Sequence, residues 1–215
     1  MNLKSFYSNL QVVSGFSIFV TLLFVLLYRK SISKKFVPLA ILVGIACITE
    51  VINFVFLAKD QNNDLVIRVY TIFEAVLISY FYFLFFKGSF SANWFLIILI
   101  IFFFVAIIDL YFNGIQNFDN YATSFESITF SAMSLWAFYF IAKKFLFEKI
   151  LSEPVFWFNA GILIYFGGNL ILFIFDNYML KYRTSSHIAL WTMHSVLNIF
   201  YNIILAVGFW KTKRA

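Results

Sequence analysis

Apolar residues along this chain fall into seven long runs, which short polar stretches separate. Each run has about the 20 residues that a helix needs to cross the hydrocarbon core of a bilayer. The pattern therefore predicts an all-α integral membrane protein with seven transmembrane helices, organised as a single domain over residues 1–215. The predicted segments are 11–28, 36–58, 65–86, 92–112, 121–142, 155–178 and 187–210.

Composition supports this class and narrows the functions within it. Hydrophobic residues make up 63% of the chain and charged residues 12%, about half the charged share of a soluble domain. The short connections leave no space for a kinase, nucleotide-binding or DNA-binding domain, so any signal has to pass to a separate partner. Cys47 is the only cysteine, which excludes an intramolecular disulfide and a thiolate metal cluster.

Basic residues are distributed unevenly between the two sets of alternating connections. One set holds Lys4, Lys59, Lys181 and Arg183, and the other holds eleven basic residues. The positive-inside rule makes the richer set cytoplasmic, which predicts an external N-terminus and a cytoplasmic C-terminus in a plasma (inner) membrane. This topology accounts for the net charge of +6 without a nucleic-acid partner. The richer set is Arg29, Lys30, Lys34, Lys35, Lys87, Lys143, Lys144, Lys149, Lys211, Lys213 and Arg214.

Three glutamates, Glu50, Glu74 and Glu126, interrupt the apolar runs. A carboxylate in hydrocarbon costs a few kcal/mol or more unless it is paired, protonated or hydrated, so these side chains are expected to face the inside of the bundle. Arg68 precedes Glu74 by about 9 Å of helical rise, on a different face. We therefore expect Arg68 and Glu74 to find their partners on other helices rather than in each other.

The last segment carries a polar stripe: His187, Trp191, His194, Asn198 and Asn202 follow one another at spacings of four, three, four and four. Such spacing places side chains on one face of a helix. The stripe predicts that this face lies against other protein groups rather than against lipid.

The sixth segment has a comparable face, formed by Gly161, Tyr165, Gly168, Asn169 and Asp176. Small residues such as its glycines allow two helices to approach closely. Interhelical hydrogen bonding is the alternative interpretation of both stripes, particularly for the asparagines.

Threading each segment in its predicted direction places most of the ionisable groups in the middle or outer half of the membrane. Asp109 and Asp176 are expected to be interfacial, because groups near helix ends reach water easily. The remaining groups predict a polar pocket that opens outward. Its candidate ligand-binding residues are Glu50, Glu74, Glu126, Tyr165, Asn169, Trp191, His194 and Asn198.

Seven helices with an external N-terminus resemble the layout of the opsins and of other seven-helix receptors. Opsins hold retinal through a lysine in the last helix, but the last segment here has no lysine before Lys211, so covalent retinal is not expected. The chain is also loosely similar to the ceramidase and adiponectin-receptor group of zinc hydrolases. These use three intramembrane histidines, whereas His187 and His194 are the only two here, and no site is carried over.

Three functions remain open at this point. The favoured hypothesis is a small receptor or sensor that binds a small-molecule or lipid ligand from the bilayer's outer side and relays to a cytoplasmic signalling partner. The first alternative is an intramembrane enzyme acting on lipid, with the glutamates and His194 as metal ligands or acid–base groups. The second is a proton-coupled transporter or channel. Catalytic residues, metal and cofactor are left unassigned.

Overall fold

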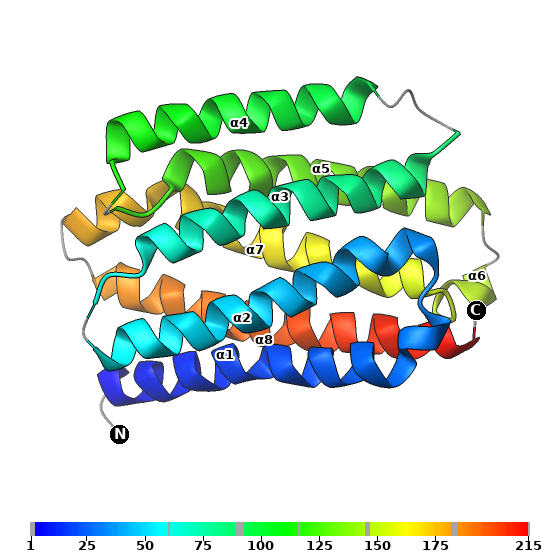
Figure 1. Ribbon diagram of the computed structural model, residues 1–215, viewed down its shortest axis with the longest axis horizontal. Coiled ribbons are helices and arrows are strands. Elements are labelled where there is room, and N and C mark those ends of the chain that lie inside the picture. The colour runs from blue at the N-terminus through cyan, green and yellow to red at the C-terminus, as the bar shows by residue number, and fades with distance from the viewer. Residues whose placement is uncertain are drawn as a thin grey trace.

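Seven long helices lie side by side in the computed structural model, which describes residues 3–59, 61–88, 93–115, 117–144, 147–181 and 185–214 (Figure 1). Within these residues, seven helices are long and apolar enough to cross a membrane, which confirms the predicted number of such helices and indicates an integral membrane protein. The short helix α6 (Phe147–Ile150) precedes the sixth of them. The long helices are α1 (Leu3–Tyr28), α2 (Val37–Ala58), α3 (Asp64–Phe86), α4 (Asn93–Asn113), α5 (Asn120–Lys144), α7 (Pro154–Lys181) and α8 (Ser185–Lys211).

Several helices are longer than the apolar runs that predicted them. Helix α1 begins at Leu3 rather than near residue 11, and α7 continues to Lys181. Backbone hydrogen bonding can continue into polar sequence, so an apolar run marks the part of a helix suited to hydrocarbon and not its ends. The predicted fourth segment starts at Ala92, which lies outside the described residues.

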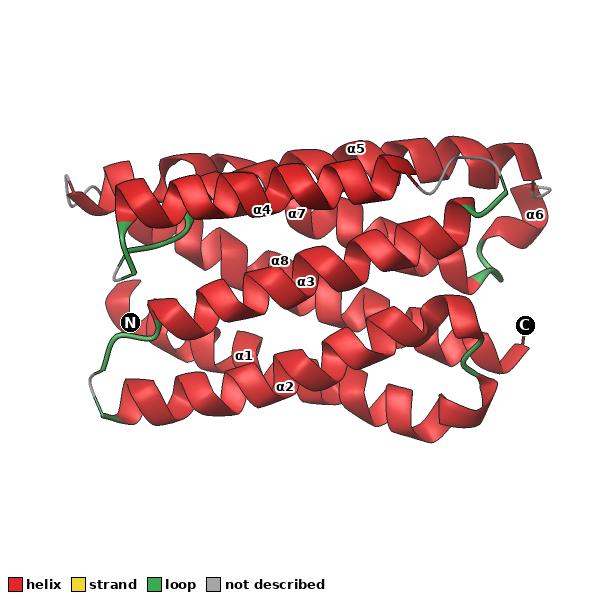
Figure 2. Cartoon of the chain, turned by 45° about the horizontal axis from the view of Figure 1, so that its top comes forward, coloured by secondary structure: helices red, strands yellow, loops and turns green. Residues whose placement is uncertain are grey.

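Contacts between the long helices connect six of them in a ring. Helix α4 lies outside this ring, beside α5 (Figure 2). Contacts run around the ring in the order α1, α2, α3, α5, α7, α8 and back to α1, and they are most extensive between α7 and α8. Helix α4 packs on α5 and α3, where the buried ring of Phe102 lies in a cluster with Ala75 and Ala122. The small alanines provide space for that ring, so α4 covers the junction between α3 and α5.

Aromatic packing fills the half of the bundle nearer the C-terminus. The ring of Phe158 lies 4.9 Å from that of Phe36 and 4.8 Å from that of Phe209, measured between centroids. Phe36 belongs to the connection between α1 and α2 and is buried in this core. Beside these rings, the hydroxyl of Tyr82 donates to Asn159 Oδ1 at 2.9 Å and lies 2.6 Å from Ser134 Oγ. This half is therefore a closed core.

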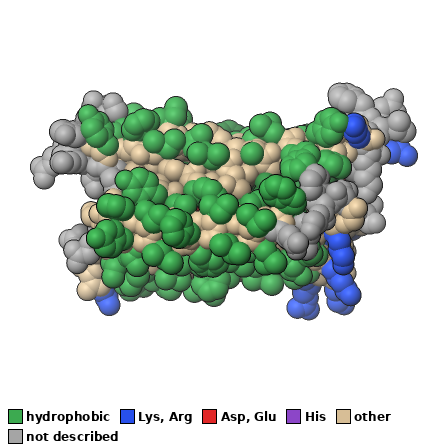
Figure 3. Space-filling view, turned by 90° about the horizontal axis from the view of Figure 1, so that it is seen from above, with side chains coloured by type: hydrophobic (Ala, Val, Ile, Leu, Met, Phe, Trp, Pro, Cys, Tyr) green, Lys and Arg blue, Asp and Glu red, His purple; other side chains and the backbone are tan. Residues whose placement is uncertain are grey.

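The face seen in Figure 3 is apolar along the length of the helices, and most of the Lys and Arg side chains visible on it lie at one end. Large side chains such as Leu57, Ile100 and Ile107 are exposed, as expected for a surface that lipid covers. The connections of the more basic set lie at the end of the bundle that holds the C-terminus (Figure 1). The structure thus places this positive charge at one end of the bundle, while its orientation in a membrane stays a prediction.

Candidate functional site

A cavity of about 480 Å³ occupies the half of the bundle remote from the C-terminus. All six ring helices contribute to its wall, and α4 does not. The cavity reaches the surface between α1 and α2 in this half, where Val12 and Leu57 line it and are exposed. Its polar lining consists of Gln11, Ser14, Thr49, Glu50, Asn53, Asn63, Tyr70, Thr71, Glu74, Thr123, Glu126, Tyr165, Trp191, His194, Ser195, Asn198, Tyr201 and Asn202.

The structure brings most of the candidate residues together in this cavity, although their role in binding a ligand stays a prediction. The candidates that line it are Glu50, Glu74, Glu126, Tyr165, Trp191, His194 and Asn198. Asn169 does not line it: its side chain is fully buried and its amide nitrogen donates to the Tyr165 carbonyl oxygen at 2.9 Å. Asn169 is therefore buried in the protein interior and bonded to its own helix, and it is not part of the cavity wall.

Close packing of α7 against α8 positions the aromatic side of the site. A Cβ atom on Gly168 would lie 2.7 Å from a methyl carbon of Leu197, and one on Gly161 would lie 3.3 Å from the ring of Tyr201. The predicted close approach at these glycines is confirmed. It brings the rings of Tyr165 and Tyr201 into a stack with centroids 4.8 Å apart.

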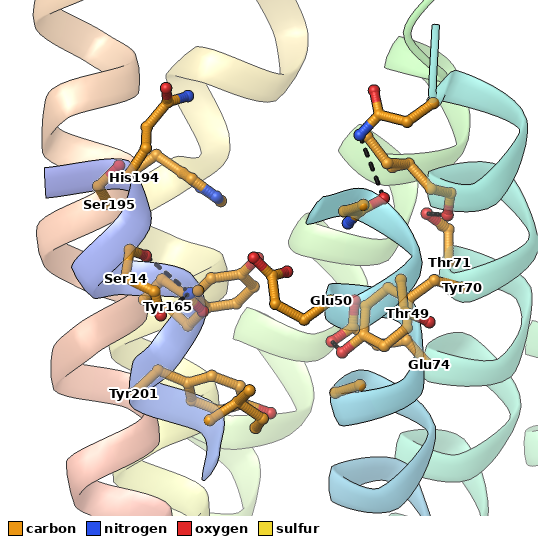
Figure 4. Close-up of a pocket in the computed structure, with 18 of the residues that line it drawn as sticks. Ser14, Thr49, Glu50, Tyr70, Thr71, Glu74, Tyr165, His194, Ser195 and Tyr201 are labelled. Atoms are coloured by element: carbon orange, nitrogen blue, oxygen red, sulfur yellow. Dashed lines mark hydrogen bonds between the residues drawn. The ribbon is translucent and has the colours of Figure 1, made fainter. Parts of the chain in front are cut away.

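Acidic and aromatic groups face each other across the cavity. Figure 4 shows Tyr165, Tyr201 and His194 on one side, with Glu50 and Glu74 coming from the α2 and α3 side. Glu50 reaches across toward α1, where its carboxylate lies against a backbone position without a side chain. A Cβ atom on Gly15 would be 2.0 Å from Glu50 Oε1, so only glycine leaves room for this conformation.

The partner of Glu74 differs from the prediction. Its Oε1 accepts a hydrogen bond from the Tyr70 hydroxyl at 2.9 Å, so the partner is one turn earlier on its own helix, not on another. A tyrosine is long enough to reach a side chain four residues on, a pairing that charge patterning alone does not indicate.

Arg68 does find its partner on another helix, as predicted. Its Nη1 lies 3.8 Å from Asp109 Oδ2 on α4, and its Nη2 donates to the carbonyl oxygens of Gly114 and Asn117, both at 2.8 Å. These contacts tie the α4–α5 connection to α3 and direct the guanidinium away from the cavity.

Asp109 and Asp176 lie near helix ends, as predicted, but the expectation that they reach water there is wrong, because both are buried within the protein. Asp109 is enclosed by Arg68 and by the backbone N–H of Ala122, which donates to its Oδ2. Asp176 Oδ1 accepts from the Trp191 indole at 2.6 Å and lies 3.1 Å from His187 Nε2. Specific protein partners, rather than water, satisfy these two acids.

Asp119 lies in the connection just before α5 and is also buried. Burial raises the pKa of its carboxyl group from the usual 3.8 to about 6, and the Arg68 charge opposes part of that rise. The end of the bundle near the cavity therefore holds an acid that titrates in a mildly acidic range.

Helix α1 supplies three polar residues that the sequence interpretation missed, and one of them, Ser14, lines the cavity. Asn198 Nδ2 donates to Ser14 Oγ at 2.9 Å, Asn202 Nδ2 donates to Ser17 Oγ at 2.7 Å, and the Thr21 hydroxyl donates to the Asn202 carbonyl oxygen. The signal was present, because residues 14, 17 and 21 follow one another at spacings of three and four in an otherwise apolar run. These bonds confirm interhelical bonding for the two asparagines.

The fold and the cavity define a seven-helix bundle that is apolar outside and acidic and aromatic within. No three His, Cys, Asp or Glu side chains among the described residues are grouped so that they could hold a metal ion. Comparisons with protein-family models, curated proteins and solved structures find no significant match. The chemistry of the cavity is therefore the guide to function.

Proposed function

We propose that the protein is a small receptor or sensor that binds a small molecule in this cavity and relays its binding through the helices. The observation that carries this proposal is the division of the bundle into two halves. One half holds a cavity of about 480 Å³ lined by all six ring helices, and the other half is packed with aromatic rings. Small-molecule pockets commonly measure about 300–1,000 Å³.

The ring helices run through both halves, and α7 and α8 show this connection most clearly. Helix α7 supplies Tyr165 to the cavity and Phe158 to the aromatic core, and α8 supplies His194 and Phe209 in the same way. A displacement of either helix at the cavity would alter the packing in the closed half, because packed cores do not deform continuously. The positive-inside rule predicts that the basic end lies in the cytoplasm. In that orientation the change in packing would occur at the end of the bundle where a cytoplasmic partner could bind.

Ligand-dependent stabilisation is the first test. A panel of cationic, neutral and anionic small molecules is screened against the purified protein by thermal unfolding in detergent. A ligand at 100 times its Kd adds about 2.7 kcal/mol of stability, which shifts the midpoint measurably. We expect Glu74→Gln and His194→Ala to abolish the shift. Glu153→Gln is the matched control, since this acid precedes α7 at the opposite end of the bundle. An unchanged shift in both cavity variants would contradict the proposal.

Gly15→Ala tests the cavity without removing any polar group. The added methyl group would overlap Glu50 Oε1, so the carboxylate has to move. Because the end of a glutamate side chain is flexible, we expect the fold to persist and the ligand-induced shift to fall. Gly44→Ala is the control, because a Cβ atom there meets nothing within 4 Å. Equal ligand-induced shifts in the two variants would show that the position of Glu50 is irrelevant.

Proton-coupled transport is the second candidate, and it rests on the presence of Glu50, Glu74 and Glu126 in one cavity. Transport would require the aromatic core below the cavity to open during each cycle. Proton flux into liposomes that disappears in Glu74→Gln would favour this function. If no flux is seen and a ligand stabilises the protein, transport is rejected and the receptor function is supported.

A further inference from the structure

The cavity carries acidic groups without a basic partner. Glu50, Glu74 and Glu126 line it, whereas none of its described lining residues is a lysine or an arginine. The nearby cation Arg68 is held by Asp109 and by backbone carbonyl oxygens, outside the cavity. Buried carboxylates need a proton or a cation to offset their lost hydration. The described part of the chain thus supplies no lysine or arginine inside this cavity.

Several polar atoms in the cavity wall have no hydrogen-bond partner. They are Glu126 Oε1, Tyr201 Oη and His194 Nδ1, and the side chains of Glu126 and Tyr201 are only 2% and 4% exposed. A buried polar atom without a partner costs about 1–3 kcal/mol, so such atoms in a native structure require an explanation. All three can accept a hydrogen bond, and the carboxylate can only accept when it is ionised.

Strong donors in the same wall are already used within the protein. The Trp191 indole donates to Asp176, the Tyr70 hydroxyl donates to Glu74, and the Asn198 amide donates to Ser14. The polar atoms that these bonds leave without a partner, Glu126 Oε1, Tyr201 Oη and His194 Nδ1, can all accept from a ligand, and the tyrosine hydroxyl can also donate. A ligand that offsets the three acids is positive and carries donors.

Aromatic rings form the rest of the wall. Tyr165 and Tyr201 are stacked, and Trp191 lies with its ring centroid 5.0 Å from that of His194 and 5.9 Å from that of Phe118. The electron-rich faces of tyrosine and tryptophan attract organic cations, by about 2 kcal/mol where water is excluded. The rings also provide a surface for an apolar ligand body.

We propose that the cavity binds an organic ammonium ion with N–H groups on an apolar body. The inference rests on the receptor function proposed above and specifies its ligand. The ammonium group would donate to Glu126 and offset the acidic charge, while the apolar body packs against the rings of Tyr165 and Tyr201. A fatty acid or anionic lipid headgroup would instead meet three carboxyl groups with no basic partner.

The experiment compares probes that share one ring and differ in charge. 2-Phenylethylammonium, 2-phenylethanol and 3-phenylpropionate are titrated to ~10 mM against the full chain in nanodiscs of zwitterionic lipid, with thermal midpoint and tryptophan fluorescence as readouts. We expect the ammonium probe to bind about tenfold more tightly than the alcohol, and the carboxylate not to bind. N,N,N-Trimethyl-2-phenylethylammonium, which lacks N–H groups, should bind more weakly than the primary amine.

Two variants tie binding to the unpartnered acceptors. Glu126→Gln should weaken the ammonium probe about tenfold, and Tyr201→Phe, which keeps the ring and removes only the hydroxyl, should weaken it severalfold. Glu153→Gln should leave it unchanged. Because Tyr201→Phe is nearly isosteric, it keeps the test valid if Glu126→Gln does not fold.

The failure of this inference is distinguishable from failure of the receptor function. Equal or tighter binding of the alcohol or the carboxylate probe would overturn the ammonium preference and leave a small-molecule cavity in place. If both cavity variants bind the ammonium probe as tightly as the unchanged protein, the probe binds to lipid or to another surface. That result would also overturn the inference. If none of the probes binds, the ammonium inference is overturned as well. The receptor function is rejected only if no molecule in the thermal-unfolding panel gives a stabilisation that depends on the cavity residues.

Discussion

Replacing Arg68 with methionine is expected to destabilise the protein by about 3–5 kcal/mol. The guanidinium lies 3.8 Å from the carboxylate of Asp109, which is completely buried, and donates to the carbonyl oxygens of Gly114 and Asn117. Its loss leaves a buried carboxylate without a counter-charge and releases the α4–α5 connection from α3. The midpoint of thermal or denaturant unfolding in detergent micelles measures this effect.

A double variant separates charge from packing. Arg68→Met combined with Asp109→Asn removes both charges and keeps an oxygen that accepts from the Ala122 N–H, so it should recover much of the lost stability. Lys59→Met is the control for loss of an exposed cation at the same end, and its effect should be within about 0.5 kcal/mol. A double variant as unstable as Arg68→Met alone would show that the ion pair is not the source of the effect.

Gly208→Ala is expected to destabilise the closed half of the bundle by about 1–3 kcal/mol. A Cβ atom at Gly208 would lie 2.6 Å from Phe158 Cε1 and 2.7 Å from its Cδ1. Phe158 is fully buried between Phe36 and Phe209, so its ring has no free volume into which to move. The midpoint of thermal unfolding should fall accordingly.

Gly44→Ala again provides the matched control. Nothing lies within 4 Å of a Cβ atom there, and replacing glycine by alanine inside a helix favours the helix by about 0.5–1 kcal/mol. The two exchanges add the same methyl group to helix interiors and should therefore shift stability in opposite directions. Similar midpoints of thermal unfolding for the two variants would show that the aromatic core near α8 can rearrange to accommodate the added methyl group.

Much of the fold could be predicted from the sequence because its signals are local. Runs of apolar residues define the seven spans, and the spacing of Trp191, His194, Asn198 and Asn202 defines one face of α8, which does line the cavity. The uneven distribution of lysine and arginine between the connections also corresponds to a basic end of the folded bundle. Each of these features depends on residues within one helix or one connection.

Features that depend on helix order could not be predicted in the same way. Periodicity identifies the inward face of a helix but not the neighbour it meets, so the exclusion of α4 from the ring was not predictable from its apolar run. The burial of Asp109 follows from that arrangement, because its partner Arg68 comes from α3. The network of Tyr82, Ser134 and Asn159 likewise joins three helices, and no pattern within one helix indicates it.

The position of α4 makes the wall of the bundle unequal in thickness. Two layers of helix separate the cavity from the surroundings at the junction of α3 and α5, whereas α1 and α2 form a single layer beside Glu50 and Gly15. Helices α7 and α8 likewise have no helix packed outside them. In a bilayer, lateral pressure or a change in lipid thickness would therefore act on the cavity least through the α3–α5 side, where α4 acts as a brace.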